Sequence, residues 1–229
     1  MIARFLPLAL LFTVSAVQAA AAPSTLKAPA DRHIRVAFVM TEGATMIDFA
    51  GPWEVFQDVH VPERGQTMEE HMPFELFTVG ASKEPIQTSG GMTVVPQYTF
   101  ADAPMPDVVV VGAQRGAPEL SDWLRKVRGK AQVVMSVCTG AFKLAEAGLL
   151  DGKQATTHHD FYEPFSSRYP KVTLVRSKRY VQSDPVVFTA GGLTSGIDLA
   201  LHVVELYFGR ATAERTARYM EYESDGWKN

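Results

Sequence analysis

The chain has 229 residues, and its 22 Lys and Arg against 25 Asp and Glu give a formal net charge of −3. This weak acidity argues against a general nucleic-acid binder, so we expect no nucleic-acid partner. A single cysteine rules out an intramolecular disulfide, although exported proteins often rely on such bridges.

The N-terminal residues have the pattern of a secretory signal peptide. Arg4 precedes an apolar run over 5–17 that is too short to span a bilayer comfortably, and small residues follow it. We therefore expect residues 1–22 to be removed on export, with the mature chain in the periplasm; an N-terminal membrane anchor is the alternative. Residues 23–32 predict a flexible leader, and residues 33–229 predict one folded domain without a further membrane span.

Strand and helix patterns alternate along this domain, which predicts an α/β fold: a doubly wound, mostly parallel sheet sandwiched by helices. Ligands of such folds bind at the carboxyl ends of the strands, here in the loops after Met40, Val111 and Val137. The predicted strands cover 33–40, 74–79, 107–112, 132–137 and 154–157, with paired strands within 86–95 and within 180–189, and the predicted helices cover 46–59, 119–129, 140–145, 160–168, 194–208 and 211–222.

Cys138 lies where a buried strand pattern changes into a helical pattern. Gly140 permits a tight turn, and the unpaired N–H groups of the new helix face the sulfur. We expect their field to favour the thiolate, which is the nucleophilic form. The pattern therefore predicts a nucleophile elbow; a buried structural cysteine is the alternative.

Four further residues are candidates for the site around this thiol. Asp48 follows the first strand and could exchange a proton with a substrate or hydrogen-bond the sulfur, or it could cap the helix over 46–59. Thr139 offers a hydroxyl and an N–H next to the sulfur. Gly112 and Ala113 offer N–H groups at a strand end, which suit an anion-binding hole.

The run His158-His159-Asp160 suggests a metal site. Neighbouring residues at a strand end point to opposite faces, so we expect no joint ligation and no metal. His158 is a candidate neighbour of the thiol, with a purely structural histidine as the alternative. Further along, Thr194 or Ser195 is expected to be the N-cap of the helix that follows.

Four segments, 46–56, 136–152, 155–158 and 191–205, resemble the ThiJ/PfpI superfamily, which has the class I glutamine amidotransferase-like fold. The superfamily's protease-like members carry histidine where this chain has Thr139, and its glyoxalase-type members carry glutamate where it has Asp48. The combination of Asp48 with Cys138-Thr139 resembles the isocyanide hydratase branch. It is also similar to the amidase-like domain of AraC-type regulators.

The resemblance implies a lyase that hydrates an isocyanide, a small-molecule electrophile, without cofactor or metal. In that mechanism the Cys138 thiolate attacks the terminal carbon, and Asp48 transfers protons and activates water. Thr139 and the N–H groups near Gly112 position the adduct, and a thioimidate is hydrolysed to an N-formamide. The resemblance also implies a homodimer.

Two departures from this branch bear on the substrate. His159 stands where relatives often have tryptophan, and the known enzymes are cytoplasmic whereas this chain carries a signal-peptide pattern. The regulators have a further helix-turn-helix domain of about 100 residues. This chain ends soon after its last predicted helix, so we do not expect a regulator. Two alternatives stay open: a non-catalytic protein with Cys138 as an oxidisable thiol, and a glyoxalase-like activity on methylglyoxal.

Overall fold

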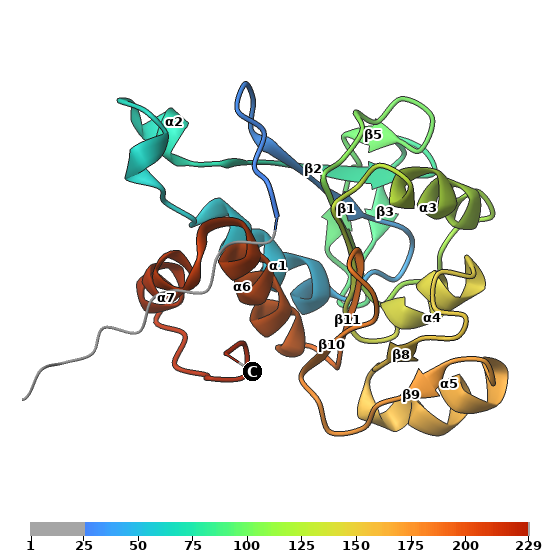
Figure 1. Ribbon diagram of the computed structural model, residues 1–229. Helices are drawn as coiled ribbons and strands as arrows, with labels where there is room; N and C mark the ends of the chain where they lie inside the picture. The colour runs from blue at the N-terminus through green and yellow to red at the C-terminus, as the bar shows by residue number, and fades with distance from the viewer. Residues whose placement is uncertain (1–25, 229) are drawn as a thin grey trace, which may run out of the picture.

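A seven-stranded sheet forms the centre of the molecule in the computed structural model, which describes residues 26–228 (Figure 1). The predicted signal peptide at 1–22 lies outside the described residues. The strands of this sheet are β1 (Ile34–Val39), β2 (Phe74–Gly80), β5 (Tyr98–Thr99), β6 (Val108–Val111), β7 (Val133–Ser136), β10 (Tyr180–Gln182) and β11 (Val187–Ala190).

The strand order is β10-β11-β7-β6-β1-β2-β5, and every pair is parallel except β10 with β11. Two smaller sheets flank it. One is the antiparallel hairpin of β3 (Ile86–Gln87) and β4 (Thr93–Val94), and the other is the parallel pair of β8 (Gln154–Ala155) and β9 (Thr173–Leu174).

Helices cover both faces of the central sheet, which confirms the predicted doubly wound α/β fold (Figure 1). Among the helices of residues 26–228, none is long and apolar enough to cross a bilayer. One face of the sheet carries α1 (Met46–Gln57), α6 (Ser195–Phe208) and α7 (Arg210–Tyr219). The other face carries α3 (Leu120–Arg128), α4 (Gly140–Glu146) and α5 (Tyr162–Arg168). The remaining helical segments are single turns: η1 (Pro62–Arg64), α2 (Met68–His71) and η2 (His159–Phe161).

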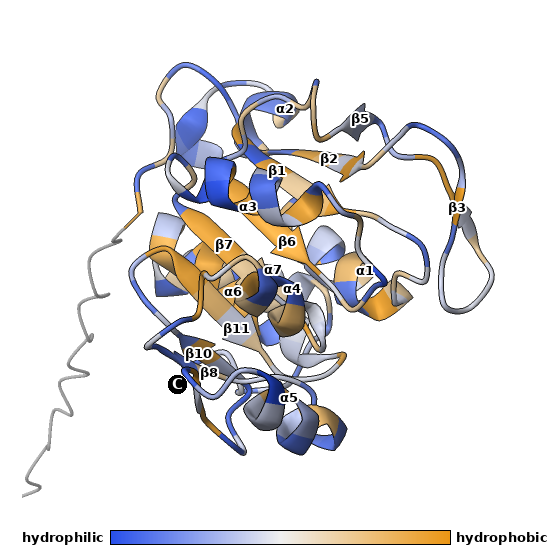
Figure 2. Cartoon of the chain, turned by 90° about the vertical axis from the view of Figure 1, so that its right-hand side faces the viewer, coloured by the Kyte–Doolittle hydropathy of each residue, from blue (hydrophilic) through white to orange (hydrophobic). Residues whose placement is uncertain are grey.

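The central strands β6 and β7 are apolar along their length, as their orange colour in Figure 2 shows. All four residues of β6 are buried valines. Val108 and Val110 pack under α1 and α6, while Val109 and Val111 pack under α3 and α4, because successive side chains of a strand alternate. Each buried valine stabilises the fold by about 1.5–3 kcal/mol, and this two-sided burial explains the continuous apolar strand patterns.

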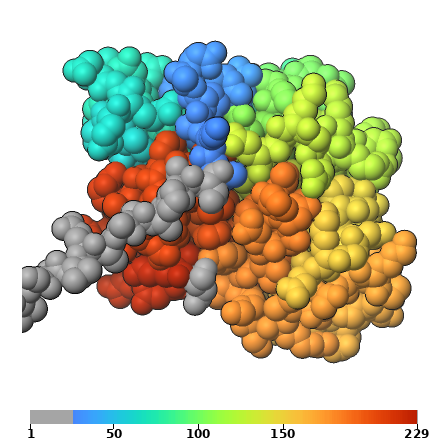
Figure 3. Space-filling model, viewed as in Figure 1, coloured from blue at the N-terminus to red at the C-terminus, as the bar shows by residue number. Residues whose placement is uncertain are grey.

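Residues 26–32 do not behave as the predicted flexible leader. The N–H of Leu26 donates to the carbonyl of Leu206 at 3.0 Å, and Arg32 forms an ion pair with Asp107 at 2.5 Å. Figure 3 shows the N-terminal segment, in blue, against the C-terminal helices, in red. From residue 26 onward the leader is therefore packed on the domain.

One prediction about local structure is wrong, and another is confirmed only in its position. The strand expected over 154–157 ends at Ala155, because the Thr156 N–H donates to the Thr189 hydroxyl at 2.9 Å instead of continuing the ladder. Thr194 is the N-cap residue of α6, as predicted, but its side chain makes no capping bond; its Oγ1 accepts from Arg179 at 3.0 Å.

The sheet topology creates a crevice at one edge. β1 pairs with β2 on one side and with β6 on the other, so the strand order changes direction there. Val39, Val111 and Ser136 lie in one row across β1, β6 and β7. The segments that follow these three strands therefore converge at the site where such folds bind ligands.

Candidate active site

Cys138 occupies a turn with a strained backbone between β7 and α4. Its φ of 58° lies in the left-handed region, which residues other than glycine rarely adopt. Its N–H donates to the carbonyl of Gly191 at 2.8 Å, and the Thr157 hydroxyl donates to its carbonyl at 2.9 Å. These bonds hold the cysteine in its unfavourable conformation, and the turn is the predicted nucleophile elbow.

Gly140 is needed at the elbow because of close packing. A Cβ atom there would lie 2.0 Å from the carbonyl oxygen of Val111. The first turn of α4 thus contacts the end of β6 directly, and this contact fixes the direction in which the helix leaves the sheet.

Asp48 lies in the first turn of α1 and is fully buried. Its Oδ2 accepts a hydrogen bond from the Ala113 N–H at 2.9 Å, so the carboxyl group binds the loop after β6 and does not cap its own helix. Among the described residues, Oδ1 has no well-formed hydrogen bond. A Cβ on Gly112 would lie 2.8 Å from the Cβ of Asp48, so glycine is required there for the close approach.

The pKa of Cys138 contradicts the expectation of a stabilised thiolate. Burial of the thiol, which leaves Cys138 only 7 % exposed, and the negative charge of Asp48 raise its pKa to about 11. The N–H groups of Thr139 and Leu193 face the sulfur and lower its pKa, as expected of the elbow, but burial outweighs them. The cysteine is therefore a thiol at neutral pH.

The pKa of Asp48 is raised to about 6, chiefly by burial, while hydrogen bonds from Ala113 and Cys138 partly lower it. At neutral pH the pair therefore consists of a carboxylate next to a thiol. A carboxylate with a pKa near 6 can accept a proton and return it, which is the property a general acid–base needs.

The N–H groups that face the thiol differ in part from the predicted ones. The N–H of Ala113 already donates to Asp48, so it is not open to a substrate anion as we expected. The N–H of Leu193, which the sequence analysis missed, faces the sulfur instead. Leu193 has a φ of 53° and follows Gly191-Gly192, and this glycine pair before a helix is the signal that could have revealed it.

His158 packs against the loop that carries Leu193. A Cβ on Gly192 would lie 2.1 Å from its ring. The His159 ring stacks on it at 4.4 Å, so our reason for excluding joint metal ligation is wrong: the two rings lie together, and their ligand atoms lie within 4.8 Å of those of Asp160. However, Nδ1 of His158 accepts from the Asp160 N–H at 3.2 Å, and a metal at that nitrogen would have to break this bond.

Two cavities lie beside the thiol. A cavity of about 460 Å³ is lined by Thr157 and Leu193, both of which contact Cys138, and by His158. A smaller cavity of about 180 Å³ is lined by Thr139, by residues of α4, and by Gln114, Phe161 and Arg168. Each cavity is thus lined by a neighbour of Cys138, while Cys138 itself is not among the lining residues of either.

A cysteine on a nucleophile elbow, facing a buried carboxyl group at the switch point of a doubly wound sheet, defines the glutamine amidotransferase-like class of cysteine proteins. The sequence model of the DJ-1/PfpI family matches residues 34–206, and the chain belongs to this family. The predicted resemblance to the ThiJ/PfpI superfamily is therefore confirmed.

The relatives include an enzyme and transcriptional regulators. Isonitrile hydratase from Pseudomonas putida is 31 % identical over 195 residues, covering 82 % of this chain and 78 % of that protein. The HTH-type transcriptional regulator CdhR from Pseudomonas aeruginosa is 32 % identical over 136 residues, and the match covers 57 % of this chain but only 40 % of the regulator. The crystal structure of a ThiJ/PfpI family protein from Pseudomonas syringae superposes with a TM-score of 0.71 at 24 % identity, covering 92 % of this chain and 85 % of that one.

Proposed function

We propose that the protein is a cysteine-dependent hydratase that adds water to an isocyanide, R–N≡C, and releases the N-formamide R–NH–CHO. The observation that carries this proposal is the buried Asp48 carboxylate beside the Cys138 thiol. The name of one relative, isonitrile hydratase from Pseudomonas putida, supports the choice of an isocyanide as the substrate.

In the first half of the proposed reaction, the sulfur bonds to the terminal carbon of the isocyanide. Asp48 takes the thiol proton as the C–S bond forms and returns it to the same carbon, which gives the thioimidate R–N=CH–S–Cys138. The N–H groups of Thr139 and Leu193 stabilise the negative charge that develops on sulfur as its proton leaves.

In the second half, the Asp48 carboxylate accepts a proton from a water molecule that attacks the thioimidate carbon. The nitrogen is protonated, the C–S bond breaks, and the sulfur regains its proton. The products are the formamide and the free enzyme, so one water is consumed for each isocyanide. Every proton transfer uses Asp48, whose pKa of about 6 suits both directions near neutral pH.

The same geometry weighs against the redox alternative. An oxidisable sensor cysteine reacts as the thiolate and is accessible to solvent. Cys138 has a raised pKa and is buried. We therefore favour chemistry in which a neighbouring base removes the thiol proton during the attack.

The signal-peptide pattern at 1–22 and the family resemblance lead to two accompanying proposals: the mature chain is exported, and it is a homodimer. The N-terminal sequence of the protein recovered from a periplasmic extract tests the first proposal. Sedimentation equilibrium of the purified chain tests the second.

The proposed activity is tested by incubating the purified protein with an aryl isocyanide and quantifying the formamide, with methylglyoxal and peroxide as parallel reactants. Formamide that accumulates in proportion to enzyme concentration supports the hydratase. Lactate from methylglyoxal would indicate a glyoxalase-like enzyme. No turnover of either compound, together with oxidation of Cys138 by peroxide, would replace the proposal with the redox alternative.

A further inference from the structure

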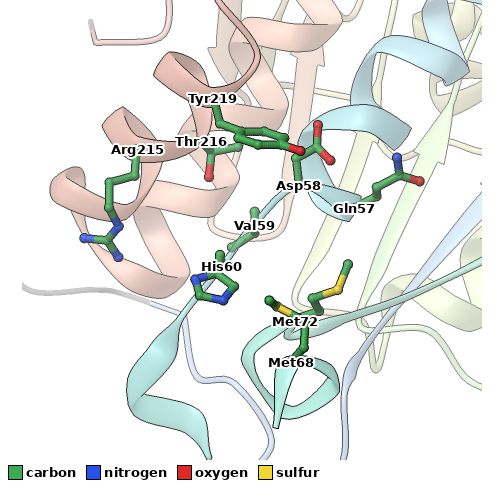
Figure 4. Close-up of a pocket in the computed structure, with 9 residues that line it drawn as sticks. All are labelled: Gln57, Asp58, Val59, His60, Met68, Met72, Arg215, Thr216 and Tyr219. Carbon is green, nitrogen blue, oxygen red and sulfur yellow. The ribbon is translucent and has the colours of Figure 1, made fainter.

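A third cavity, of about 440 Å³, lies at the end of α1, between α2 and α7 (Figure 4). It shares no lining residue with the two cavities beside Cys138. Its lining is unusual in combining imidazole and thioether side chains. The lining residues are Gln57, Asp58, Val59, His60, Met68, Met72, Arg215, Thr216 and Tyr219.

Both methionines are exposed although they are large and apolar: Met68 is 66 % exposed and Met72 is 39 % exposed. Met68, His71 and Met72 have i, i+3, i+4 spacing along α2 and the residue that follows it. Positions i and i+3 lie on one face of the single turn of α2, and Met72, the extended residue that follows, lines the cavity together with Met68. Two thioethers and an imidazole are therefore presented together.

His60 reaches this group from the chain that leaves α1. Its Nε2 lies 3.2 Å from Nδ1 of His71, and the two rings meet edge to face. Next to it, the N–H of Val61 donates to the carbonyl of His71 at 2.8 Å, which joins the two segments. Figure 4 shows His60 and the two methionines at the same end of the cavity.

The hydrogen bonding of His71 fixes which of its two ring nitrogens carries the proton. Its Nε2 lies 3.1 Å from the carbonyl oxygen of Gly65, which can only accept, so a neutral His71 carries its proton on Nε2. The lone pair on Nδ1 then faces His60. A backbone carbonyl that holds the second ring nitrogen is the usual support of a metal-binding histidine.

The distance between the two histidine nitrogens also fits a metal. Two imidazoles that bind one tetrahedral ion at about 2.0–2.1 Å place their nitrogens about 3.3–3.4 Å apart. The observed 3.2 Å needs only a small shift. Without metal, the His60 Nε2–H donates to His71 Nδ1; metal binding requires that proton to move to Nδ1 of His60.

The segment is held rigidly without metal. Thr67 and Glu70 form a reciprocal capping box at the start of α2, and Glu70 also accepts from the N–H of Gln66 at 2.7 Å. Because these bonds fix the helical turn, little ordering is left for a ligand to bring about.

We propose that His60, His71, Met68 and Met72 bind one Cu(I) ion. Thioether sulfur is a soft ligand that selects Cu(I) over harder divalent ions, and imidazole also binds copper. The site is independent of the proposed hydratase activity, because it lies in a separate cavity and uses none of the same residues.

The test uses the full chain in a Cys138→Ser background, which removes the thiol as a competing Cu(I) ligand. Cu(I), kept reduced with ascorbate, is titrated in competition with a chromogenic Cu(I) chelator. Binding is compared for the parent, His60→Gln, and the double variant Met68→Leu/Met72→Leu, in which side-chain volume is nearly unchanged. Met92→Leu and His159→Gln are controls, because Met92 is exposed elsewhere and His159 lies in the cavity beside Cys138.

We expect about one Cu(I) per chain in the parent and in both controls, and at least about tenfold weaker binding in His60→Gln and in the methionine variant. Copper K-edge absorption of the loaded parent should show both nitrogen and sulfur neighbours. No binding by the parent, or unchanged affinity in the methionine variant with unchanged circular dichroism, would overturn the proposal. Tighter binding of Zn(II) than of Cu(I) would also overturn it.

Discussion

Replacing Asp48 with asparagine separates two effects that the carboxyl group has on Cys138. Its negative charge raises the pKa of the thiol, so its removal should make the thiol more acidic. The same carboxylate is the proposed base that removes the thiol proton. The two effects act in opposite directions on the rate, because one increases the amount of thiolate and the other removes the proton acceptor.

The size of the loss follows from the two groups. With a pKa of about 11, only about one thiol in 10⁴ is ionised at pH 7 without help from a base. General acid–base catalysis contributes about 10²–10⁴-fold to a rate. We therefore expect Asp48→Asn to lower kcat/KM for an aryl isocyanide by about 10²–10⁴-fold, while the pKa of Cys138 falls.

Two assays test this combination. Initial rates of formamide formation give kcat/KM, and thiolate absorbance near 240 nm, followed against pH, gives the pKa of the single cysteine. In the unaltered enzyme, kcat/KM should fall as the pH drops through about 6, where Asp48 becomes protonated. A variant that is as fast as the parent, or faster, with a more acidic thiol would refute the role of Asp48 as base.

The same substitution changes stability in a pH-dependent way. Asp48 has a folded pKa of about 6 against an ordinary value of 3.8, so the folded state binds protons more tightly than the unfolded state. The contribution of Asp48 to the free energy of unfolding is most favourable below pH 4, where the carboxyl group is protonated, and is lost as the pH rises through 6. Above pH 6 the buried carboxylate lowers the free energy of unfolding by up to about 3 kcal/mol. Urea unfolding should therefore show Asp48→Asn to be more stable than the parent at pH 7.5, with a smaller difference at pH 4.5. An equal difference at both pH values would contradict this account.

Two further substitutions test the supports of the site. Gly112→Ala places a Cβ 2.8 Å from the Cβ of Asp48. It should therefore lower kcat/KM and reduce the free energy of unfolding in urea by about 1–3 kcal/mol. The control Gly90→Ala, whose Cβ would meet only the sulfur of Met46 at 3.9 Å, should change neither quantity. Equal effects of the two alanines would count against the packing argument. Thr157→Val removes the shorter of two hydrogen bonds to the carbonyl of Cys138 and leaves the one from the Ala141 N–H at 3.5 Å. This loss should cost about 0.5–1.5 kcal/mol of unfolding free energy, and an unchanged urea midpoint would show that the bond is dispensable.

The sequence was sufficient to predict the fold and the position of the elbow, because both depend on local periodicity. Four consecutive valines at 108–111 indicate a strand buried on both faces, and the change of period at Cys138 indicates a strand-to-helix turn. Asp48 could be assigned to the same crevice because it follows a neighbouring parallel strand. These inferences need only the order of the elements.

The properties of the thiol could not be predicted in this way. Its pKa depends on how deeply the packed helices bury it and on its contact with Asp48, 90 positions earlier in the chain. The N–H of Leu193 comes from a loop 55 positions later, and the packing of Leu26 depends on a carbonyl at Leu206. Such long-range contacts leave little trace in local sequence patterns.

The most direct test of the central claim compares the parent with Cys138→Ala in turnover of an aryl isocyanide. The account predicts that the parent forms the N-formamide and that the variant forms none above the uncatalysed rate, while circular dichroism shows an unchanged fold. Formamide production by Cys138→Ala at a rate near that of the parent would contradict nucleophilic catalysis by this cysteine.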